Sequence, residues 1–174
     1  MTPAEVVRAL AARPSVRSFD GRPVAPELID QLVEPARWTG SARNRQPWRF
    51  LAVDDAPTLR SLATLGAYAQ HVATAPCAIV ILSADNGMRD TEFDVGRVAQ
   101  TLSLAAAALG LGCCLATIYP DDNVTRAAAL LRVADGWLPR HVLSIGHPGP
   151  RPTGRRAIPG GRLDPDELLT RHRP

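Results

Sequence analysis

Apolar residues recur at helical spacing near the start of the chain. The segment Thr2–Glu5 is a capping box with Pro at the first helical position, which predicts a helix to about Ala12. A second helix is expected to begin at Pro26 and to be kinked or shortened by Pro35. Its apolar face would be formed by Leu28, Ile29, Leu32, Val33 and Ala36.

Short runs of apolar and β-branched residues predict the strands. They cover residues 49–53, 77–83, 113–119 and 141–145. The run from Cys77 to Ser83 is apolar without interruption before its last residue, which is typical of a central strand buried on both faces.

Further helices are predicted between these strands. Asp54 or Asp55 should start one of them, and Asp121 or Asp122 should cap another that runs to about Leu131. A long helix is expected over residues 92–109, before Gly110, and a last short one at 164–167. Strands interleaved with helices indicate an α/β or α+β sandwich.

The chain reads as one domain over residues 1–174, with no internal repeat or linker. Apolar residues make up 45% of it and charged residues 21%, as in an ordinary globular protein with a real core. Residues 148–161 are rich in Gly, Pro and Arg, so we expect an extended arm there.

The charges argue against nucleic acid as a partner. All 20 basic residues are Arg, the 17 acidic residues are scattered among them, and the net charge is +3. No basic run is interleaved with aromatic residues, as nucleic-acid binding would favour. The small positive excess suits an anionic cofactor instead.

Residues 98–120 carry no charge, a length sufficient to cross a bilayer. Because the stretch contains polar residues and glycines, we expect it to be buried in the core or in a subunit interface, with no membrane partner. The three cysteines, with Cys113 and Cys114 adjacent, form neither a disulfide framework nor a zinc pattern. Glu5 and Arg8 interrupt any apolar signal segment. A reduced, cytoplasmic location is expected.

Two short segments carry candidate chemistry. Arg13, Ser15 and Arg17 place two guanidiniums and a hydroxyl close together, which suits a phosphate. Ser41, Asn44 and Gln46 precede Pro47-Trp48, and amides carry both the donors and the acceptors needed to bind the polar edge of a heterocycle. Phosphate at one end and a polar-edged ring at the other describe a nucleotide-like cofactor.

These segments also carry a family resemblance. The patterns Arg-x-Ser-x-Arg-x-Phe (residues 13–19) and Ser-x-x-Asn-x-Gln-Pro-Trp (residues 41–48) resemble those of the FMN-dependent nitroreductase family. The likeness continues through residues 94–112 and 145–148 to the pair Arg155-Arg156. It implies an α+β sandwich with a central, mostly antiparallel sheet flanked by helices, in an intertwined homodimer with C-terminal arm exchange and cofactor sites at the subunit interface.

The resemblance also implies roles for individual residues toward FMN. Arg13, Ser15 and Arg17 would bind its phosphate, and Ser41, Asn44 and Gln46 would line the flavin and its ribityl chain. Arg155 and Arg156 would reach the phosphate. The backbone of Ala116 and Thr117 would approach the reactive edge of the flavin.

The implied activity is oxidoreduction through FMN. NADH or NADPH would bind only transiently, since Gly110-Leu-Gly112 lacks the dinucleotide fingerprint, and would give hydride to flavin N5. A small flat aromatic acceptor, such as a nitroaromatic, a quinone or free flavin, would then take the same place. Two alternatives stay open: a specialised family member, either dehalogenase-like, flavin-fragmenting or deazaflavin-linked, and a non-catalytic flavin-binding or storage protein. No catalytic or metal role is expected for His71, His141, His147 or His172.

Overall fold

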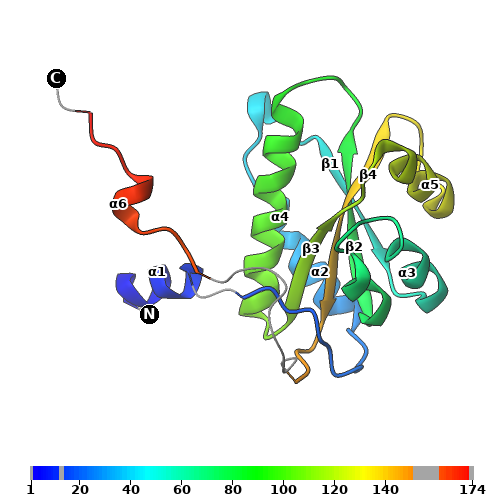
Figure 1. The fold of residues 1–174 in the computed structure, drawn as a ribbon, viewed down its shortest axis with the longest axis horizontal. Helices are drawn as coiled ribbons and strands as arrows, with labels where there is room; N and C mark the ends of the chain where they lie inside the picture. The colour runs from blue at the N-terminus through cyan, green and yellow to red at the C-terminus, as the bar shows by residue number, and fades with distance from the viewer. Residues whose placement is uncertain (1, 12–13, 151–160, 173–174) are drawn as a thin grey trace.

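The central element is a four-stranded sheet in which every neighbouring pair is antiparallel (Figure 1). This computed structural model describes residues 2–11, 14–150 and 161–172. The strands lie in the order β1 (Trp48–Val53), β2 (Cys77–Ala84), β4 (Trp137–Gly146) and β3 (Gly112–Thr117). The predicted antiparallel sheet is thereby confirmed, and the Cys77 run is one of its two inner strands.

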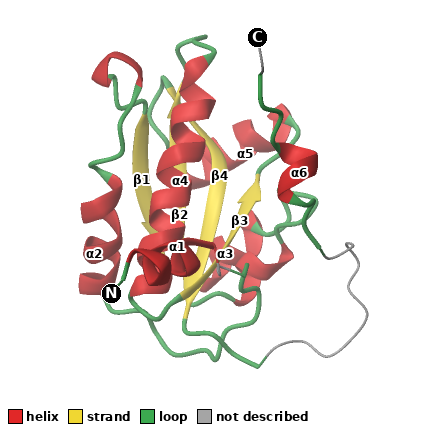
Figure 2. Ribbon diagram, turned by 90° about the vertical axis from the view of Figure 1, so that its left-hand side faces the viewer, coloured by secondary structure: helices red, strands yellow, loops and turns green. Residues whose placement is uncertain are grey.

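Helices cover both faces of this sheet. One face packs against α2 (Pro26–Ala36) and α4 (Asp90–Ala108), and the other against α3 (Ala56–Leu62) and α5 (Asp121–Leu131). Figure 2 views the molecule from the side of α4, with α3 and α5 behind the strands. Side chains of a strand alternate between its two faces, so β2 supplies both layers of the core. Ile79 and Ile81 pack in the α4 layer, and Ala78 and Val80 in the α3 layer.

The two terminal helices stand apart from this body (Figure 1). The predicted capping box is confirmed in α1 (Pro3–Ala11), where the Glu5 amide donates to Thr2 Oγ1 at 3.3 Å and the Thr2 amide to Glu5 Oε2 at 2.7 Å. No residue of α1 or of α6 (Pro165–Leu168) is buried. Apolar side chains on both helices are therefore exposed: Val6, Val7, Leu10 and Leu168.

The charge-free residues 98–120 divide between the second half of α4 and β3. Their apolar side chains lie partly in the core, as expected. No helix in the described parts of the chain has the length and apolar character needed to cross a membrane.

Three local predictions need correction. Asp121 and Asp122 do not cap α5; they are its first two residues, behind Pro120, where negative charge still suits the positive end of the helix dipole. The fourth strand begins at Trp137 and not at His141, because its early residues pair with β2 beyond an irregularity between Ile81 and Ser83. A 3-10 helix over Gln70–Thr74 was not predicted at all. The predicted cap of α3 is confirmed, since the Asp55 side chain accepts from the Thr58 amide.

Candidate functional site

The segment Pro14–Ser18 lies along the outer edge of β3. The Val16 amide donates to the Cys113 carbonyl at 2.9 Å. Gly112 permits this approach, because a Cβ there would stand 2.6 Å from a methyl carbon of Val16. The contact leaves Ser15 and Arg17 exposed on either side of Val16. Within the described residues no carboxylate forms an ion pair with Arg17, so its charge is available to an anion.

A buried polar network lies beneath Arg17. His71 Nδ1 lies 2.8 Å from Ser144 Oγ, and this hydroxyl donates to the Cys114 carbonyl at 3.2 Å. The Ser144 hydroxyl therefore accepts from His71, and Nδ1 carries the hydrogen. Burial first, and then the charge of Arg17, lower the pKa of His71 to about 4, so this imidazole is neutral at physiological pH. Burial likewise raises the pKa of the Cys114 thiol, although Arg17 and Ser15 oppose the shift.

The second predicted segment forms a strained loop at the other end of the sheet. Arg43, Asn44 and Gln46 have φ angles of 51°, 53° and 49°, a left-handed backbone uncommon outside glycine. Ser41 Oγ accepts from the Gln46 amide at 2.8 Å, and Gln46 Nε2 donates to Asn44 Oδ1 at 3.2 Å. The side chains of Asn44 and Gln46 are nevertheless exposed, and Ser41 is half-buried. Strain of this kind concentrates at binding sites.

Helix α4 holds this loop in place. Asp94, which is 2% exposed, accepts from the Ala42 amide at 2.8 Å and from Arg97 Nη1 at 3.3 Å. Arg45 forms an ion pair with Asp90 at the beginning of the same helix. The loop conformation therefore depends on the carboxylates of the first turns of α4.

The two predicted segments do not line a common hollow in the single chain. Ser15 lines a hollow that extends along α4 from Gly96 to Ala107. The loop instead contacts Asp94, near the beginning of the helix, and none of its residues lines that hollow. A single chain therefore does not join Ser15 with Ser41, Asn44 and Gln46 in one hollow.

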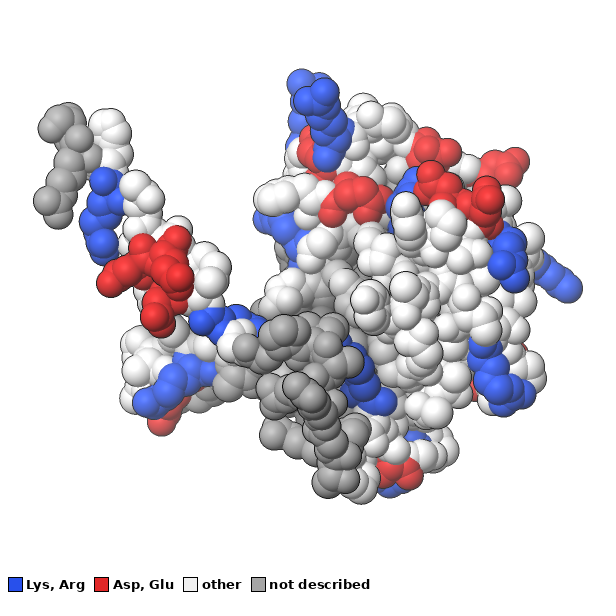
Figure 3. Space-filling model, in the orientation of Figure 1, with Lys and Arg blue, Asp and Glu red and all other residues white. Residues whose placement is uncertain are grey.

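A groove runs along the exposed face of α4. A hollow of about 620 Å³ includes Phe93 and Arg97, and one of about 440 Å³ includes Ser15 and Leu115. Gly96 and Gln100 border both, so the hollows are continuous along the helix. Their volumes lie in the range of small-molecule sites. In Figure 3 the middle of the body is largely uncharged, with Arg and acidic side chains mainly toward its margins.

The edge of β3 offers backbone donors to this groove. The Ile118 amide donates inward to the Arg140 carbonyl, while the Cys113 carbonyl faces outward to Val16. Backbone groups alternate along an antiparallel strand, so the amides of Leu115 and Thr117 face outward as well. No described residue accepts from either amide. Of the two predicted backbone positions, Thr117 therefore directs its amide to the open edge and Ala116 directs its own to β4.

Three of the predicted site residues cannot be placed. Arg13, Arg155 and Arg156 lie outside the described residues. Sequence reasoning gave no role to His71 or to the pair His141–Glu92, because these side chains meet their partners only through the fold. Asp94 was recognised as the first residue of the family pattern at 94–112, but its contact with the loop was not predicted. Among the described residues, no cluster of three or more His, Cys, Asp or Glu side chains could hold a metal ion.

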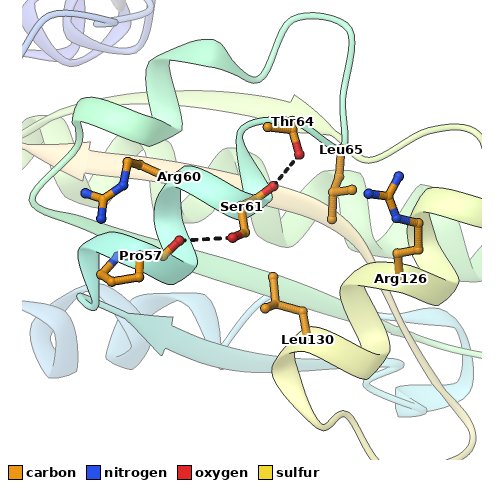
Figure 4. Close-up of a pocket in the computed structure, with 7 residues that line it drawn as sticks. All are labelled: Pro57, Arg60, Ser61, Thr64, Leu65, Arg126 and Leu130. Carbon is orange, nitrogen blue, oxygen red and sulfur yellow. Dashed lines mark hydrogen bonds between the residues drawn. The ribbon is translucent and has the colours of Figure 1, made fainter.

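A separate hollow of about 460 Å³ lies between α3 and α5 on the other face of the sheet (Figure 4). Arg60 and Arg126 stand on either side of it, with Leu65 beside Arg126 and Leu130 lower in the view. Arg126 Nη1 donates to Asn123 Oδ1 at 3.1 Å. None of the predicted site residues lines this hollow, and we assign it no role.

Comparison with known proteins places the chain in a family. The profile of the nitroreductase family matches residues 10–71 and 58–147, which together span both predicted segments and the whole sheet. The chain belongs to the nitroreductase family. The resemblance identified from the sequence is thereby confirmed.

Individual relatives of this nitroreductase-family chain agree with that assignment. A Methanothermobacter thermautotrophicus protein with the provisional name NADH dehydrogenase/NAD(P)H nitroreductase is 30% identical over 168 residues, covering 94% of this chain and 85% of the relative. A Bacillus subtilis FMN reductase [NAD(P)H] is 24% identical over 176 residues, covering 89% and 70%. A crystal structure from Parabacteroides distasonis, also provisionally named NADH dehydrogenase/NAD(P)H nitroreductase, has a TM-score of 0.78 at 29% identity and covers 89% of this chain and 94% of its own.

Proposed function

We propose that this protein is an FMN-dependent NAD(P)H oxidoreductase that works as a homodimer, with each FMN site shared between two chains. The family and the names of the relatives support the reductase activity and the two cofactors. The observation that carries the shared site is that the hollow lined by Ser15 includes no residue of the Ser41–Gln46 loop. A second copy of the chain, packed against the groove, supplies the missing half of each site.

The phosphate end of FMN fits the segment beside β3. Arg17 is exposed and, in the described part of the chain, has no acidic partner, and Ser15 adds a hydroxyl at the rim of the same hollow. A guanidinium binds phosphate oxygens through strong, charge-assisted hydrogen bonds. This cationic phosphate-binding site would be extended by Arg13, Arg155 and Arg156.

The ring end of FMN fits the loop and the open edge of β3. Asn44 and Gln46 present amides that can pair with the donors and acceptors of the flavin pyrimidine ring. The outward amides of Leu115 and Thr117 add donors that would stabilise negative charge on the reduced flavin. Ser41 acts through the backbone, since its hydroxyl holds the Gln46 amide at 2.8 Å.

The exposed apolar surfaces support the homodimer with exchanged arms. Helices α1 and α6 carry apolar side chains that the single chain leaves in solvent, Val7 and Leu168 among them. On α4, Phe93 is 70% exposed, and the neighbouring Gly96 has open space where a side chain would stand. Apolar faces of this kind are ordinarily covered by a partner.

The chemistry follows a ping-pong order. FMN held at this site would supply hydride transfer at N5, first from NAD(P)H and then to a flat acceptor such as a nitroaromatic, a quinone or free flavin. The protein binds the phosphate through Arg17, orients the ring through Asn44 and Gln46, and leaves the exposed face of the ring open. The nicotinamide and the acceptor use that face in turn, so no separate dinucleotide domain is needed.

Complementation between two defective variants tests the shared site. Arg17→Gln weakens the phosphate seat, and Asn44→Asp with Gln46→Glu places carboxylates at the ring while keeping the side-chain shapes. Each homodimer is expected to lose FMN binding. Heterodimers, co-expressed with two affinity tags, regain one site per dimer, because one of the two sites combines unmodified halves. Heterodimers that bind no more FMN than the parent variants would show that both halves come from the same chain.

A further inference from the structure

Three side chains distant in sequence form a hydrogen-bonded row where α4 passes over the sheet. His141 Nε2 on β4 lies 2.9 Å from Glu92 Oε2 on α4. His141 Nδ1 lies 3.4 Å from Thr117 Oγ1 on β3. Thr117 and His141 are directly opposite each other in the β3–β4 register, so the backbone of the sheet fixes their approach.

The chemistry of the three groups sets the direction of the hydrogen bonds. The hydrogen bond from His141 is the largest of the contacts that lower the pKa of Glu92, so this carboxylate is ionised and can only accept. His141 Nε2 must then carry a hydrogen. In the neutral imidazole Nδ1 is an acceptor for the Thr117 hydroxyl, and in the protonated imidazole it donates to that oxygen. The Thr117 hydrogen is then free to turn outward.

Both ends of the row reach the surface, and its middle is largely covered. Thr117 is exposed beside the open edge of β3, His141 has a side chain only 21% exposed, and Glu92 is 48% exposed at the other hollow of α4. Arg140 is the other charged group here, and it pairs with Glu92 at 3.7 Å and with Asp121 of α5 at 2.9 Å.

We propose that Thr117, His141 and Glu92 form a proton relay that delivers a proton to an oxygen of the bound acceptor. The relay rests on the proposed flavin site, in which Thr117 stands at the reactive edge. Thr117 would be the catalytic residue because its hydroxyl touches the acceptor. His141 supplies the proton through it, and Glu92 positions His141 and exchanges with solvent.

The proton and electron balance is simple for a quinone. The quinone takes two electrons and one hydrogen, as hydride, from the anionic reduced flavin, which returns to its oxidised form. One quinone oxygen is left negative. The Thr117 hydroxyl gives its proton to that oxygen as it takes the Nδ1 proton of cationic His141. The products are the neutral hydroquinone and neutral His141, which solvent reprotonates.

Two oxidants separate this role from a structural one. 1,4-Naphthoquinone must gain a proton when it is reduced, whereas ferricyanide takes electrons alone. The experiment is stopped-flow reoxidation of the reduced protein. Thr117→Val and His141→Gln are expected to lower the rate of reoxidation by naphthoquinone about 10²-fold, and the rate with ferricyanide by less than about twofold. Thr117→Ser, which keeps the hydroxyl, should retain the naphthoquinone rate. His172→Gln, a histidine in the C-terminal tail, serves as the matched control.

The pH profile gives a second kinetic readout. The naphthoquinone rate of the unmodified protein should fall as the pH rises, since the cationic imidazole is the proposed donor. His141→Gln should abolish this dependence. Equal slowing of both oxidants, or no slowing of naphthoquinone in Thr117→Val, would overturn the relay.

A flavin-free measurement tests the row itself. Imidazole ¹⁵N chemical shifts in the protein without FMN should report hydrogen on Nε2 of neutral His141, and a mixture of tautomers in Glu92→Gln. Hydrogen on Nδ1 in the unmodified protein would contradict the proposed direction. FMN binding and its reduction by NADH or NADPH are measured first. If FMN does not bind or is not reduced, the proposed function is wrong. If FMN binds and is reduced but the variants keep the normal quinone rate, only the relay is wrong.

Discussion

At the scale of single residues, the carboxylate of Asp94 links α4 to the cofactor loop. It is buried and holds the Ala42 amide, directly before the three left-handed residues of that loop. The loop conformation is uncommon for these residue types, so an external contact must maintain it. We therefore propose that Asp94 supports cofactor binding without touching the ligand.

Asp94→Ala should therefore weaken both the fold and the site. Leaving the Ala42 amide and Arg97 without this acceptor costs about 2 kcal/mol of unfolding free energy. FMN affinity should fall along with it, because the loop loses its anchor. Urea unfolding and FMN fluorescence titration measure the two effects. Asp122→Ala, at an exposed position in the first turn of α5, is the control: it should cost less than about 1 kcal/mol of stability and leave FMN affinity unchanged. An unaltered FMN affinity in Asp94→Ala would contradict this role.

His71 makes a prediction about pH. Its pKa is about 4 in the folded protein and about 6.5 when unfolded, so only the unfolded chain takes up the proton between these values. Above pH 6.5 this site has no effect, and as the pH falls to 4.5 it should remove about 2 kcal/mol of stability. His71→Gln should lack this part of the pH dependence. Denaturant unfolding of both proteins at pH 7 and 4.5 measures the change. An equal loss of unfolding free energy in the two proteins would show that His71 is not responsible.

Single residues were the least predictable from the sequence. The candidate site residues came from two local motifs, and in the structure Ser15, Arg17, Asn44 and Gln46 are exposed. His71–Ser144 and His141–Glu92 could not be found, since their partners lie 73 and 49 positions away. The left-handed conformation of Gln46 also lacks a signal, because it depends on Ser41 and α4 and not on glycine.

At the scale of elements, the β3 edge is the support of the phosphate segment. Gly112 and Val16 are in such close contact that no side chain fits at position 112. The bond between the Val16 amide and Cys113 places Ser15 and Arg17 on the same edge. The geometry of the proposed phosphate site thus depends on Gly112, a residue of β3 that is not itself expected to bind phosphate.

Gly112→Ala should push this segment off the strand. The added Cβ would stand 2.6 Å to 2.9 Å from three side-chain atoms of Val16. FMN binding, measured by fluorescence titration, should weaken by about tenfold or more, a change of at least about 1.4 kcal/mol. In a double-mutant cycle, Gly112→Ala should lower FMN affinity only slightly in a Val16→Gly background, where those atoms are absent. Equal costs in both backgrounds would contradict the contact.

Elements were predicted well where the hydrophobic pattern was strong. All four strands and the helices α1 to α6 appear near their expected bounds, because apolar periodicity and capping residues act locally. The early part of β4 was missed, since Pro139 and Arg140 interrupt its apolar run and pairing with β2 overrides that composition. The 3-10 helix at Gln70–Thr74 has no periodic pattern.

At the scale of the whole molecule, the exposed face of α4 is the expected surface of the dimer. Gly96 borders both hollows and has no atom near its missing Cβ. A large side chain there is tolerated by a single chain but would block a second copy. The shared-site proposal then requires that the dimer and FMN binding be lost together.

Gly96→Arg should give a folded monomer without FMN. Light scattering after size exclusion reports the mass, circular dichroism the fold, and fluorescence titration the cofactor. The helix itself should tolerate the change, because Arg favours a helix by up to about 1 kcal/mol over Gly. Thr125→Arg on the exposed side of α5 adds the same side chain away from the groove and should remain a dimer. A dimeric Gly96→Arg protein would place the interface elsewhere.

The central claim is that this chain uses FMN to oxidise a nicotinamide. The most direct test is the absorbance spectrum of the purified protein with FMN, recorded anaerobically before and after addition of NADH or NADPH. We expect flavin bands that bleach on addition. Bands that persist with both nicotinamides would contradict the reductase and indicate a flavin store or another reductant, and the absence of flavin bands after incubation with FMN would contradict the cofactor site itself.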